Sequence, residues 1–189
     1  MVTDPMNIAL WLPSSTQGRQ IKSAVKQLIS THPTIDTLLV VLDDSVKTTK
    51  RKFGSYYWMI RDAYKMALAA MTVETGLKVD LQVFVYPEYL AVDKLVQDHP
   101  DLLIYHTAGL IIPEAGLKRH AIELEDVESI NCTPVLKQRE EFDDMAPGSC
   151  NVVALGGTFD RLHAGHKLML SSAIVLANKS VVIGLTGTN

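Results

Sequence analysis

Apolar residues occur along the first part of the chain in short blocks, and polar segments separate these blocks. Unbroken apolar runs are typical of strands that are buried on both faces of a parallel sheet, whereas apolar residues three or four apart are typical of helices. The runs predict strands at residues 7–12, 38–42, 81–85 and 101–105. The helical spacings predict helices at residues 20–30, 56–75 and 89–97, and Gly76 is a C-cap for the second helix.

The alternation of strands and helices predicts an α/β fold. We expect residues 1–120 to form an N-terminal α/β domain with a mostly parallel sheet. The first strand is followed by a polar segment, residues 13–18, which could cradle an anion or simply connect two elements. No Walker-type loop and no GxGxxG pattern follows any of these strands, so the sequence does not support a kinase.

Residues 121–150 differ in composition from the segments on either side. Acidic side chains are frequent, and the stretch closes with Pro147, Gly148 and Ser149. Its second half cannot bury much apolar surface, which is typical of a linker. We therefore expect an acidic linker between two folded parts.

A strand, a loop and a helix are predicted after this linker. The apolar run 152–155 predicts a strand buried on both faces that stops at Gly156 and Gly157, and the helix is expected from Gly165 onward. Residues 180–185 predict a second parallel strand with an exposed apolar edge. In open α/β sheets ligands bind beyond the carboxyl ends of the strands, and a helix N-terminus favours a phosphate there.

The loop between this strand and this helix carries the residue types that bind phosphates. Paired glycines allow a ligand to approach the backbone closely, and Thr158 adds a hydroxyl donor. His163 and His166 are three residues apart, so their imidazoles can reach one group from about one helical turn. Such donors stabilise charge on a phosphoryl group without covalent chemistry by the protein. The loop therefore predicts a nucleotide-binding site suited to nucleotidyl transfer.

Two short motifs in this loop resemble a known signature. Gly157-Thr158-Phe159-Asp160 and His163-Ala164-Gly165-His166 resemble the GTFD and HxGH motifs of the nucleotidyltransferase superfamily. Arg161-Leu162-His163 and the α/β region ahead of the motif are most similar to the eukaryotic, fungal-type phosphopantetheine adenylyltransferases. The resemblance implies that residues 151–189 are the first β-α-β unit of a Rossmann-like, cytidylyltransferase-like domain.

The resemblance also implies a reaction. Adenylyl transfer from ATP to 4'-phosphopantetheine would give dephospho-coenzyme A and pyrophosphate in coenzyme A biosynthesis, with Mg²⁺ on the triphosphate. The acceptor phosphate is already a nucleophile, so no general base is required. The family pattern implies catalytic roles for Thr158 and His166, and contacts to the nucleotide from Gly157, Thr158, Phe159, His163, Gly165 and His166. The remaining histidines are scattered and resemble no metal site.

Part of the family pattern has no counterpart in residues 151–189. The superfamily uses a basic residue after the second strand and a later Ser/Thr-rich segment with an arginine. We therefore expect this chain to hold an incomplete, C-terminally truncated catalytic domain and to be inactive alone, whether as a fragment, a shortened gene model or a truncated paralogue. Two alternatives stay open. One is a catalytically silent relative or an interaction subunit among coenzyme A biosynthesis enzymes, and the other is a nucleotidyltransferase with another acceptor.

The composition of the chain narrows the classes of protein to which it could belong. The 189 residues are 47% apolar and 21% charged, with a net charge of −3. No apolar stretch approaches the roughly 18 residues of a membrane span, and no signal peptide is recognisable. The basic stretch 47–52 follows two aspartates and has no interleaved aromatic residues, so nucleic acid is not an expected partner. We expect a cytoplasmic protein in which Cys132 and Cys150 are free thiols.

Overall fold

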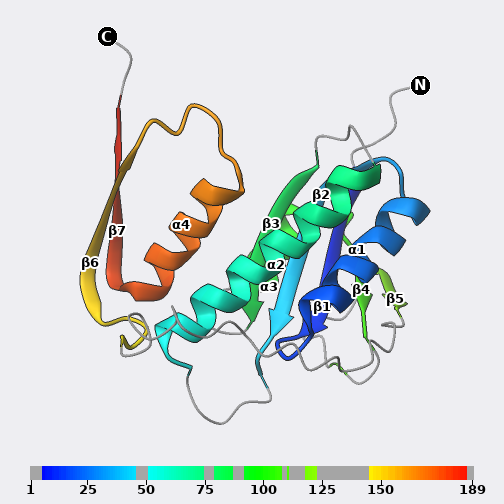
Figure 1. Ribbon diagram of the computed structural model, residues 1–189, viewed down its shortest axis with the longest axis horizontal. Coiled ribbons are helices and arrows are strands. Elements are labelled where there is room, and N and C mark those ends of the chain that lie inside the picture. The colour runs from blue at the N-terminus through cyan, green and yellow to red at the C-terminus, as the bar shows by residue number, and fades with distance from the viewer. Residues whose placement is uncertain are drawn as a thin grey trace. The chain divides into compact units, whose positions relative to one another are not determined.

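The computed structural model describes residues 6–45, 51–74, 79–86, 92–107, 110, 118–122 and 145–186. The protein is a mixed α/β fold whose paired strands are parallel (Figure 1). The chain divides into two compact units. The first comprises Met1–Val46 and Asp62–Ile130, and the second comprises Lys47–Arg61 and Asn131–Asn189.

A five-stranded sheet forms the centre of the first unit. Its strand order is β3-β2-β1-β4-β5, and all four neighbouring pairs are parallel. The strands are β1 (Met6–Pro13), β2 (Ile35–Asp43), β3 (Asp80–Tyr86), β4 (Leu103–His106) and β5 (Lys118–Ala121). The four predicted strands are confirmed, and β5 was not predicted because its four residues contain no apolar run.

Two predicted strand starts in this sheet are wrong. Strand β2 begins at Ile35, three residues before the predicted start. The pattern places the start of β4 at Asp101, but the strand begins at Leu103. The reason is local, because the backbone N–H of Leu102 donates to the carbonyl of His99 in a turn at 3.1 Å. Leu102 is nevertheless buried, so its apolar side chain contributes to the core without belonging to the strand.

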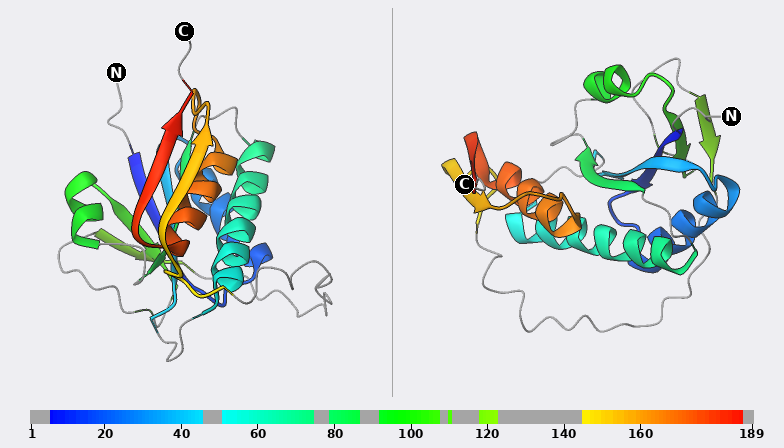
Figure 2. Two further views of the ribbon diagram at one scale, coloured as in Figure 1. Left: turned by 90° about the vertical axis from the view of Figure 1, so that its left-hand side faces the viewer. Right: turned by 90° about the horizontal axis from the view of Figure 1, so that it is seen from above.

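Helices cover both faces of the five-stranded sheet. Figure 2 shows α1 (Gly18–Thr31) and α2 (Phe53–Glu74) on one face and α3 (Val92–Asp98) on the other. Residues 8–12 of β1 have no exposed surface, as expected for a strand between two helical layers. Each such buried side chain stabilises the fold by about 1.5–3 kcal/mol. The predicted helices are confirmed, although Gly76 and residues 89–91 lie outside the described residues.

The second unit contains the predicted strand, helix and parallel strand. They are β6 (Cys150–Gly157), α4 (Ala164–Leu176) and β7 (Ala177–Leu185), and β6 pairs with β7 in parallel. The expected stop at the paired glycines is confirmed, because Gly157 is the last residue of β6. Both glycines still belong to the ladder, opposite Gly184 and Leu185.

The predicted burial of β6 on both faces is wrong. Val152 on β6 is 55% exposed and Val182 on β7 is 54% exposed. The cause is the layering, because α4 lies against one face of the pair and no other described element of the second unit covers the opposite face (Figure 2). The expected exposed apolar edge is present, with Leu185 70% exposed.

Most of the predicted linker, residues 123–144 with Cys132, lies outside the described residues, so the linker stays a prediction. Cys150 is a free cysteine. Among the described residues, no helix has the length and apolar character needed to cross a membrane.

Candidate functional site

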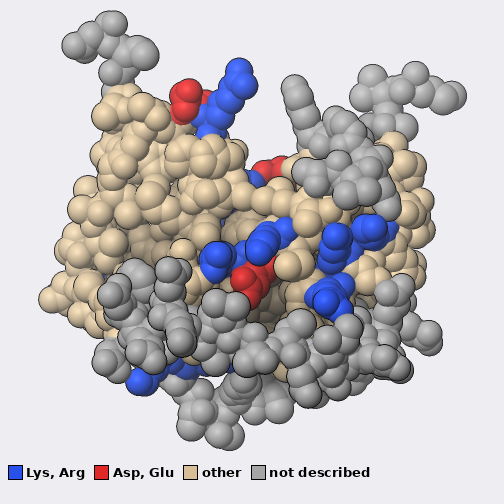
Figure 3. All heavy atoms as spheres, in the orientation of Figure 1, with Lys and Arg blue, Asp and Glu red and all other residues tan. Residues whose placement is uncertain are grey.

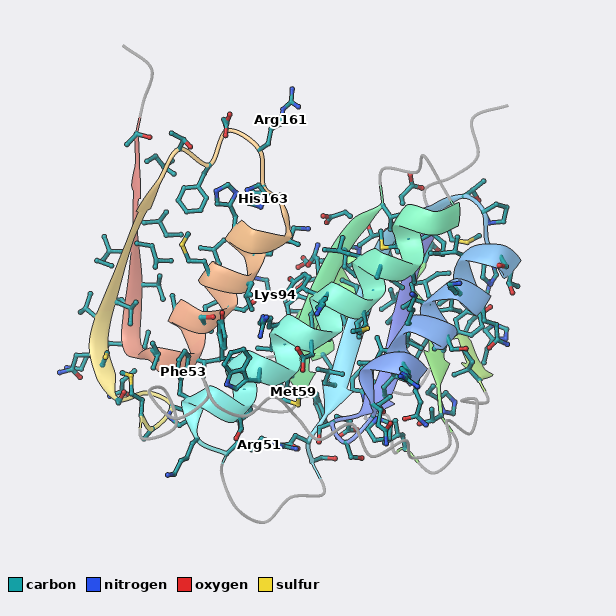
Figure 4. The ribbon with its side chains drawn as sticks, viewed as in Figure 1. Arg51, Phe53, Met59, Lys94, Arg161 and His163 are labelled. Atoms are coloured by element: carbon teal, nitrogen blue, oxygen red, sulfur yellow. The ribbon has the colours of Figure 1, made fainter. Side chains whose placement is uncertain are left out.

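The candidate site is the loop that joins the carboxyl end of β6 to the first turn of α4. It runs from Thr158 to His163. Figure 4 shows His163 at the start of α4 and Arg161 at the tip of the loop, with the Arg161 side chain pointing away from the helix. The side chains of Thr158, Asp160 and His163 are exposed, so a ligand can reach them.

His163 is the N-cap of α4. Its backbone is extended, with φ −112° and ψ 172°, and its Nδ1 atom accepts a hydrogen bond from the N–H of Gly165 at 3.1 Å. The imidazole thereby satisfies one of the free N–H groups of the first turn. An accepting Nδ1 carries no proton, so in the neutral ring the proton is on Nε2. The free end of His163 is therefore a hydrogen-bond donor.

His166 makes the opposite bond. Its Nδ1 atom lies 3.1 Å from the carbonyl oxygen of Arg161. A carbonyl can only accept, so Nδ1 donates and carries the proton of the neutral ring. The Nε2 atom of His166 is then an acceptor in the neutral ring and a donor in the imidazolium form. The loop thus holds the two imidazoles in complementary hydrogen-bonding states.

Three aromatic rings stack across the loop. The rings of His163 and His166 lie 3.9 Å apart between centroids at 28°, and those of Phe159 and His166 lie 4.9 Å apart at 39°. The two imidazoles are brought together, as their spacing predicted. Two imidazolium charges at such a distance would repel, and an anion bound beside them would offset that repulsion.

Phe159 reaches the stack through an unusual backbone conformation. Its φ is +30°, in the left-handed region that L-residues rarely adopt. Such a residue costs on the order of 1–3 kcal/mol unless its surroundings compensate, and it is frequent at functional sites. Neither this conformation nor the contact of Phe159 with His166 has a signal in the sequence beyond the motif itself.

Two of the predicted glycines are explained by close approaches. A Cβ atom at Gly157 would lie 3.1 Å from Cε2 of Phe159, and one at Gly165 would lie 3.0 Å from Cε1 of His163. Both glycines therefore make room for the rings of the stack. A Cβ atom at Gly156 would meet nothing within 4 Å, so the fold does not require that glycine.

Asp160 orders the loop backbone. Its Oδ1 atom accepts a hydrogen bond from the N–H of Arg161 at 3.0 Å. The N–H of Thr186, just after β7, donates to the carbonyl of Gly157 at 3.2 Å and so ties the start of the loop to the sheet. Within the described ranges, no group of three or more His, Cys, Asp and Glu side chains could hold a metal ion.

A cavity of about 390 Å³ borders the site at Gly165. Its other walls are largely apolar: Phe53, Tyr57, Met145, Leu168, Met169, Ser172 and Leu176. All of these residues belong to the second unit. A triphosphate needs hydrogen-bond donors and positive charge, which this lining does not provide. The lining of this cavity is therefore unsuited to a triphosphate.

Comparison with known proteins agrees with the geometry of the loop. Residues 154–189 match the cytidylyltransferase-like family. This segment is similar to the nucleotidyltransferases. Over 34 residues the chain is 53% identical to the phosphopantetheine adenylyltransferase of Archaeoglobus fulgidus, a match that covers 18% of this chain and 23% of that protein.

A second relative is less informative about chemistry. Over 65 residues the chain is 35% identical to an uncharacterized protein of Schizosaccharomyces pombe, a match that covers 34% of this chain and 20% of that protein. The matches thus span about a fifth of the length of these curated relatives. Together the comparisons support a nucleotidyltransferase superfamily assignment for the C-terminal segment.

Proposed function

We propose that the chain contributes the nucleotide-binding loop of a phosphopantetheine adenylyltransferase, which transfers the adenylyl group of ATP to 4'-phosphopantetheine. The observation that carries the proposal is the stacked pair of imidazoles at the N-terminus of α4, 3.9 Å apart and held in complementary hydrogen-bonding states. The similarity to the archaeal adenylyltransferase supports this choice among nucleotidyltransferases.

In the proposed reaction, an oxygen of the acceptor phosphate attacks the α-phosphorus of ATP. The new bond joins that oxygen to the α-phosphorus, and the bond from the α-phosphorus to the bridging oxygen breaks and releases pyrophosphate. No proton has to be removed from the nucleophile, so the protein acts by positioning two anions and neutralising charge. The described residues hold no cluster of metal ligands, so Mg²⁺ would arrive with ATP as part of the substrate.

The proposed roles combine the motif with the geometry of the loop. The Nε2–H of His163 would donate to a phosphate oxygen, and His166 would donate in its imidazolium form. Thr158 would offer its exposed hydroxyl to the α-phosphate. Gly157 and Gly165 would keep the rings in place, and Phe159 would support the ring of His166.

A catalytically silent relative is the second candidate, and one observation favours it. Arg161, the cation of the loop itself, points away from α4 (Figure 4). Removing a single charge-stabilising donor from an active site typically costs about 100-fold or more in rate. The loop could therefore bind ATP without turning it over. Alternatively, the chain could serve as an interaction subunit. A nucleotidyltransferase with another acceptor would share the same loop.

The test measures ATP binding and pyrophosphate release separately. Isothermal titration of the full chain with ATP and Mg²⁺ is compared between the wild type, His166→Ala and the control His99→Ala, whose position is in the first unit. We expect His166→Ala to weaken ATP binding about tenfold or more, as for loss of a hydrogen bond to a charged group. The control should bind ATP like the wild type.

The outcomes distinguish the candidates. Pyrophosphate release that requires both 4'-phosphopantetheine and His166 supports the adenylyltransferase. Histidine-dependent ATP binding without release supports the silent relative, and release with another acceptor, such as nicotinamide mononucleotide, supports a different transferase. Absence of ATP binding by a chain with a folded circular dichroism spectrum would refute the adenylyltransferase, the other transferase and the ATP-binding silent relative, and would leave only the interaction subunit.

A further inference from the structure

A second candidate position for a ligand lies in the first unit, at the carboxyl ends of β1 and β4. The strand order β3-β2-β1-β4-β5 means that the chain leaves β1 toward β2 and β3, while β4 and β5 lie on the other side of β1. The position between β1 and β4 is therefore the topological switch point of the sheet. Open parallel sheets bind ligands at this position, outside the carboxyl ends of the strands.

Backbone hydrogen bonds fix the conformation of the loop after β1 and tie it to the end of β2. The N–H of Ser14 donates to the carbonyl of Asp43 at 2.7 Å, and the N–H of Thr16 donates to the carbonyl of Pro13 at 2.9 Å. Helix α1 then begins at Gly18. This glycine is explained by packing, because a Cβ atom there would lie 2.9 Å from Cγ of Met66. It is therefore not itself a sign of a ligand.

Helix α1 presents positive charge at its N-terminal end. It carries Arg19, Lys22 and Lys26 and no acidic residue, and Figure 3 shows Lys and Arg side chains over this helix. A capping box closes part of this end, because the side chain of Gln17 accepts from the backbone of Gln20 and Oε1 of Gln20 accepts from the N–H of Gln17 at 3.0 Å. The helix dipole adds partial positive charge beside the N–H groups of Gly18 and Arg19. The basic side chains and the helix dipole both favour an anion.

Two buried hydroxyls in this region have no hydrogen-bond partner. They are Oγ1 of Thr16, just before α1, and Oγ1 of Thr107, just after β4. Thr107 is 8% exposed. Buried hydroxyls are nearly always hydrogen-bonded in proteins, so an unpaired one requires an explanation such as an absent ligand.

The register of the sheet places Thr107 on the same face as α1. His106 pairs with Trp11, so Thr107 follows beside Leu12. Tyr105, two residues before Thr107, contacts His32 at the end of α1, and residues two apart in a strand point to the same face. The ladder continues past His106, because the N–H of Ile122 donates to the carbonyl of His106 at 2.8 Å. Thr107 therefore points to the side from which α1 approaches.

Two carboxylates lie on the β2 side of this position. Asp43 is the last residue of β2 and pairs with Pro13 of β1, and Asp44 follows it. Their oxygens accept bonds from the protein itself. Asp43 accepts from Nε1 of Trp11 at 3.1 Å and from the N–H of Ser45 at 2.9 Å, and Asp44 accepts from Oγ of Ser14.

We propose that this position is a second ligand site, which binds the phosphate group of a small molecule between α1 and the end of β4. The hydroxyls of Thr16 and Thr107 donate to the phosphate oxygens, together with the N–H groups of Gly18 and Arg19. The side chain of Arg19 supplies a positive charge. The site is independent of the nucleotidyltransferase loop and adds a ligand-binding role to the first unit.

The test uses the full chain with both motif histidines replaced, His163→Ala and His166→Ala, so that a signal from the loop is removed. Isothermal titration with inorganic pyrophosphate and inorganic phosphate is carried out on this parent. It is repeated with Thr107→Val, Thr107→Ser and Thr16→Val added. Thr31→Val is the matched control, because its hydroxyl lies at the other end of α1 and donates to the carbonyl of Gln27.

We expect saturable binding by the parent and by Thr31→Val. Thr107→Val and Thr16→Val should each weaken it about tenfold, and Thr107→Ser, which keeps the hydroxyl, should retain it. Without ligand, Thr107→Val should melt no lower than the parent, because it removes an unpaired buried hydroxyl. Absence of saturable binding by the parent, or affinity that is equal in the valine variants, would overturn the proposal. Neither result bears on the proposed function of the nucleotidyltransferase loop, because the parent lacks both histidines of that loop.

Discussion

Replacing Gly165 by alanine is the sharpest test of the site geometry. The added Cβ atom would lie 3.0 Å from Cε1 and 3.1 Å from Nδ1 of His163, closer than ordinary van der Waals contact. Because the first atoms that it meets belong to this imidazole, the ring has to move by several tenths of an ångström or rotate. That movement disturbs both the cap bond at 3.1 Å and the stack on His166.

The expected change in stability is small, because two effects oppose each other. Alanine is favoured over glycine inside a helix by about 1 kcal/mol, and loss of an N-cap bond costs about 0.5–2 kcal/mol. The free energy of unfolding should therefore change by about 1 kcal/mol or less. Binding should change more, because a displaced donor to a charged phosphate is worth about 1.5–3 kcal/mol, which is roughly tenfold to a hundredfold in affinity.

The assay is ATP titration with Gly156→Ala as the matched control. The same methyl group at Gly156 would meet nothing within 4 Å, although both residues lie close to the loop. We expect the control to bind ATP like the wild type and Gly165→Ala to bind it more weakly. The two variants should have similar urea denaturation midpoints. Equal ATP affinities of the two variants would refute the argument that Gly165 is needed to position the ring of His163.

Two further predictions concern backbone strain and pH. Phe159→Gly should be more stable to urea than Phe159→Ala by about 1 kcal/mol, because both variants lose the ring but only alanine keeps the penalty for a positive φ. Greater stability of the alanine variant would contradict the φ of +30°. Burial, and then repulsion from His120, lower the pKa of His32 below 6.5. The unfolded chain therefore takes up this proton first as the pH falls below about 6.5, so stability decreases toward acid. Melting curves between about pH 7.5 and 5 should show a smaller decrease for His32→Gln, and an unchanged decrease would exclude His32 as its source.

The amino-acid sequence was sufficient for the order of all the described elements except β5 and for recognising the candidate loop. Strands such as residues 38–42 can be recognised because a strand between two helical layers must be apolar on both sides. The loop can be recognised because its glycines, threonine and histidines occur together between a strand and a helix. These are local properties, because each depends on residues that are close together in the sequence.

Other features depend on contacts between distant segments. Strand β5 is held by backbone bonds to β4, which require no particular side chains, so its residues carry no pattern. The exposure of Val152 is decided by which layers cover β6, and the run of apolar residues does not contain that information.

The two candidate sites illustrate the same division. The spacing of His163 and His166 predicted that they could meet, but the hydrogen bonds to Gly165 and Arg161 decide which nitrogen carries each proton. Thr16 and Thr107 come near the same edge because β1 pairs with β4. Sequence determines which local elements form, because the forces involved act within a few residues. Tertiary structure decides which groups face each other, because pairing and packing join residues that are far apart in the chain.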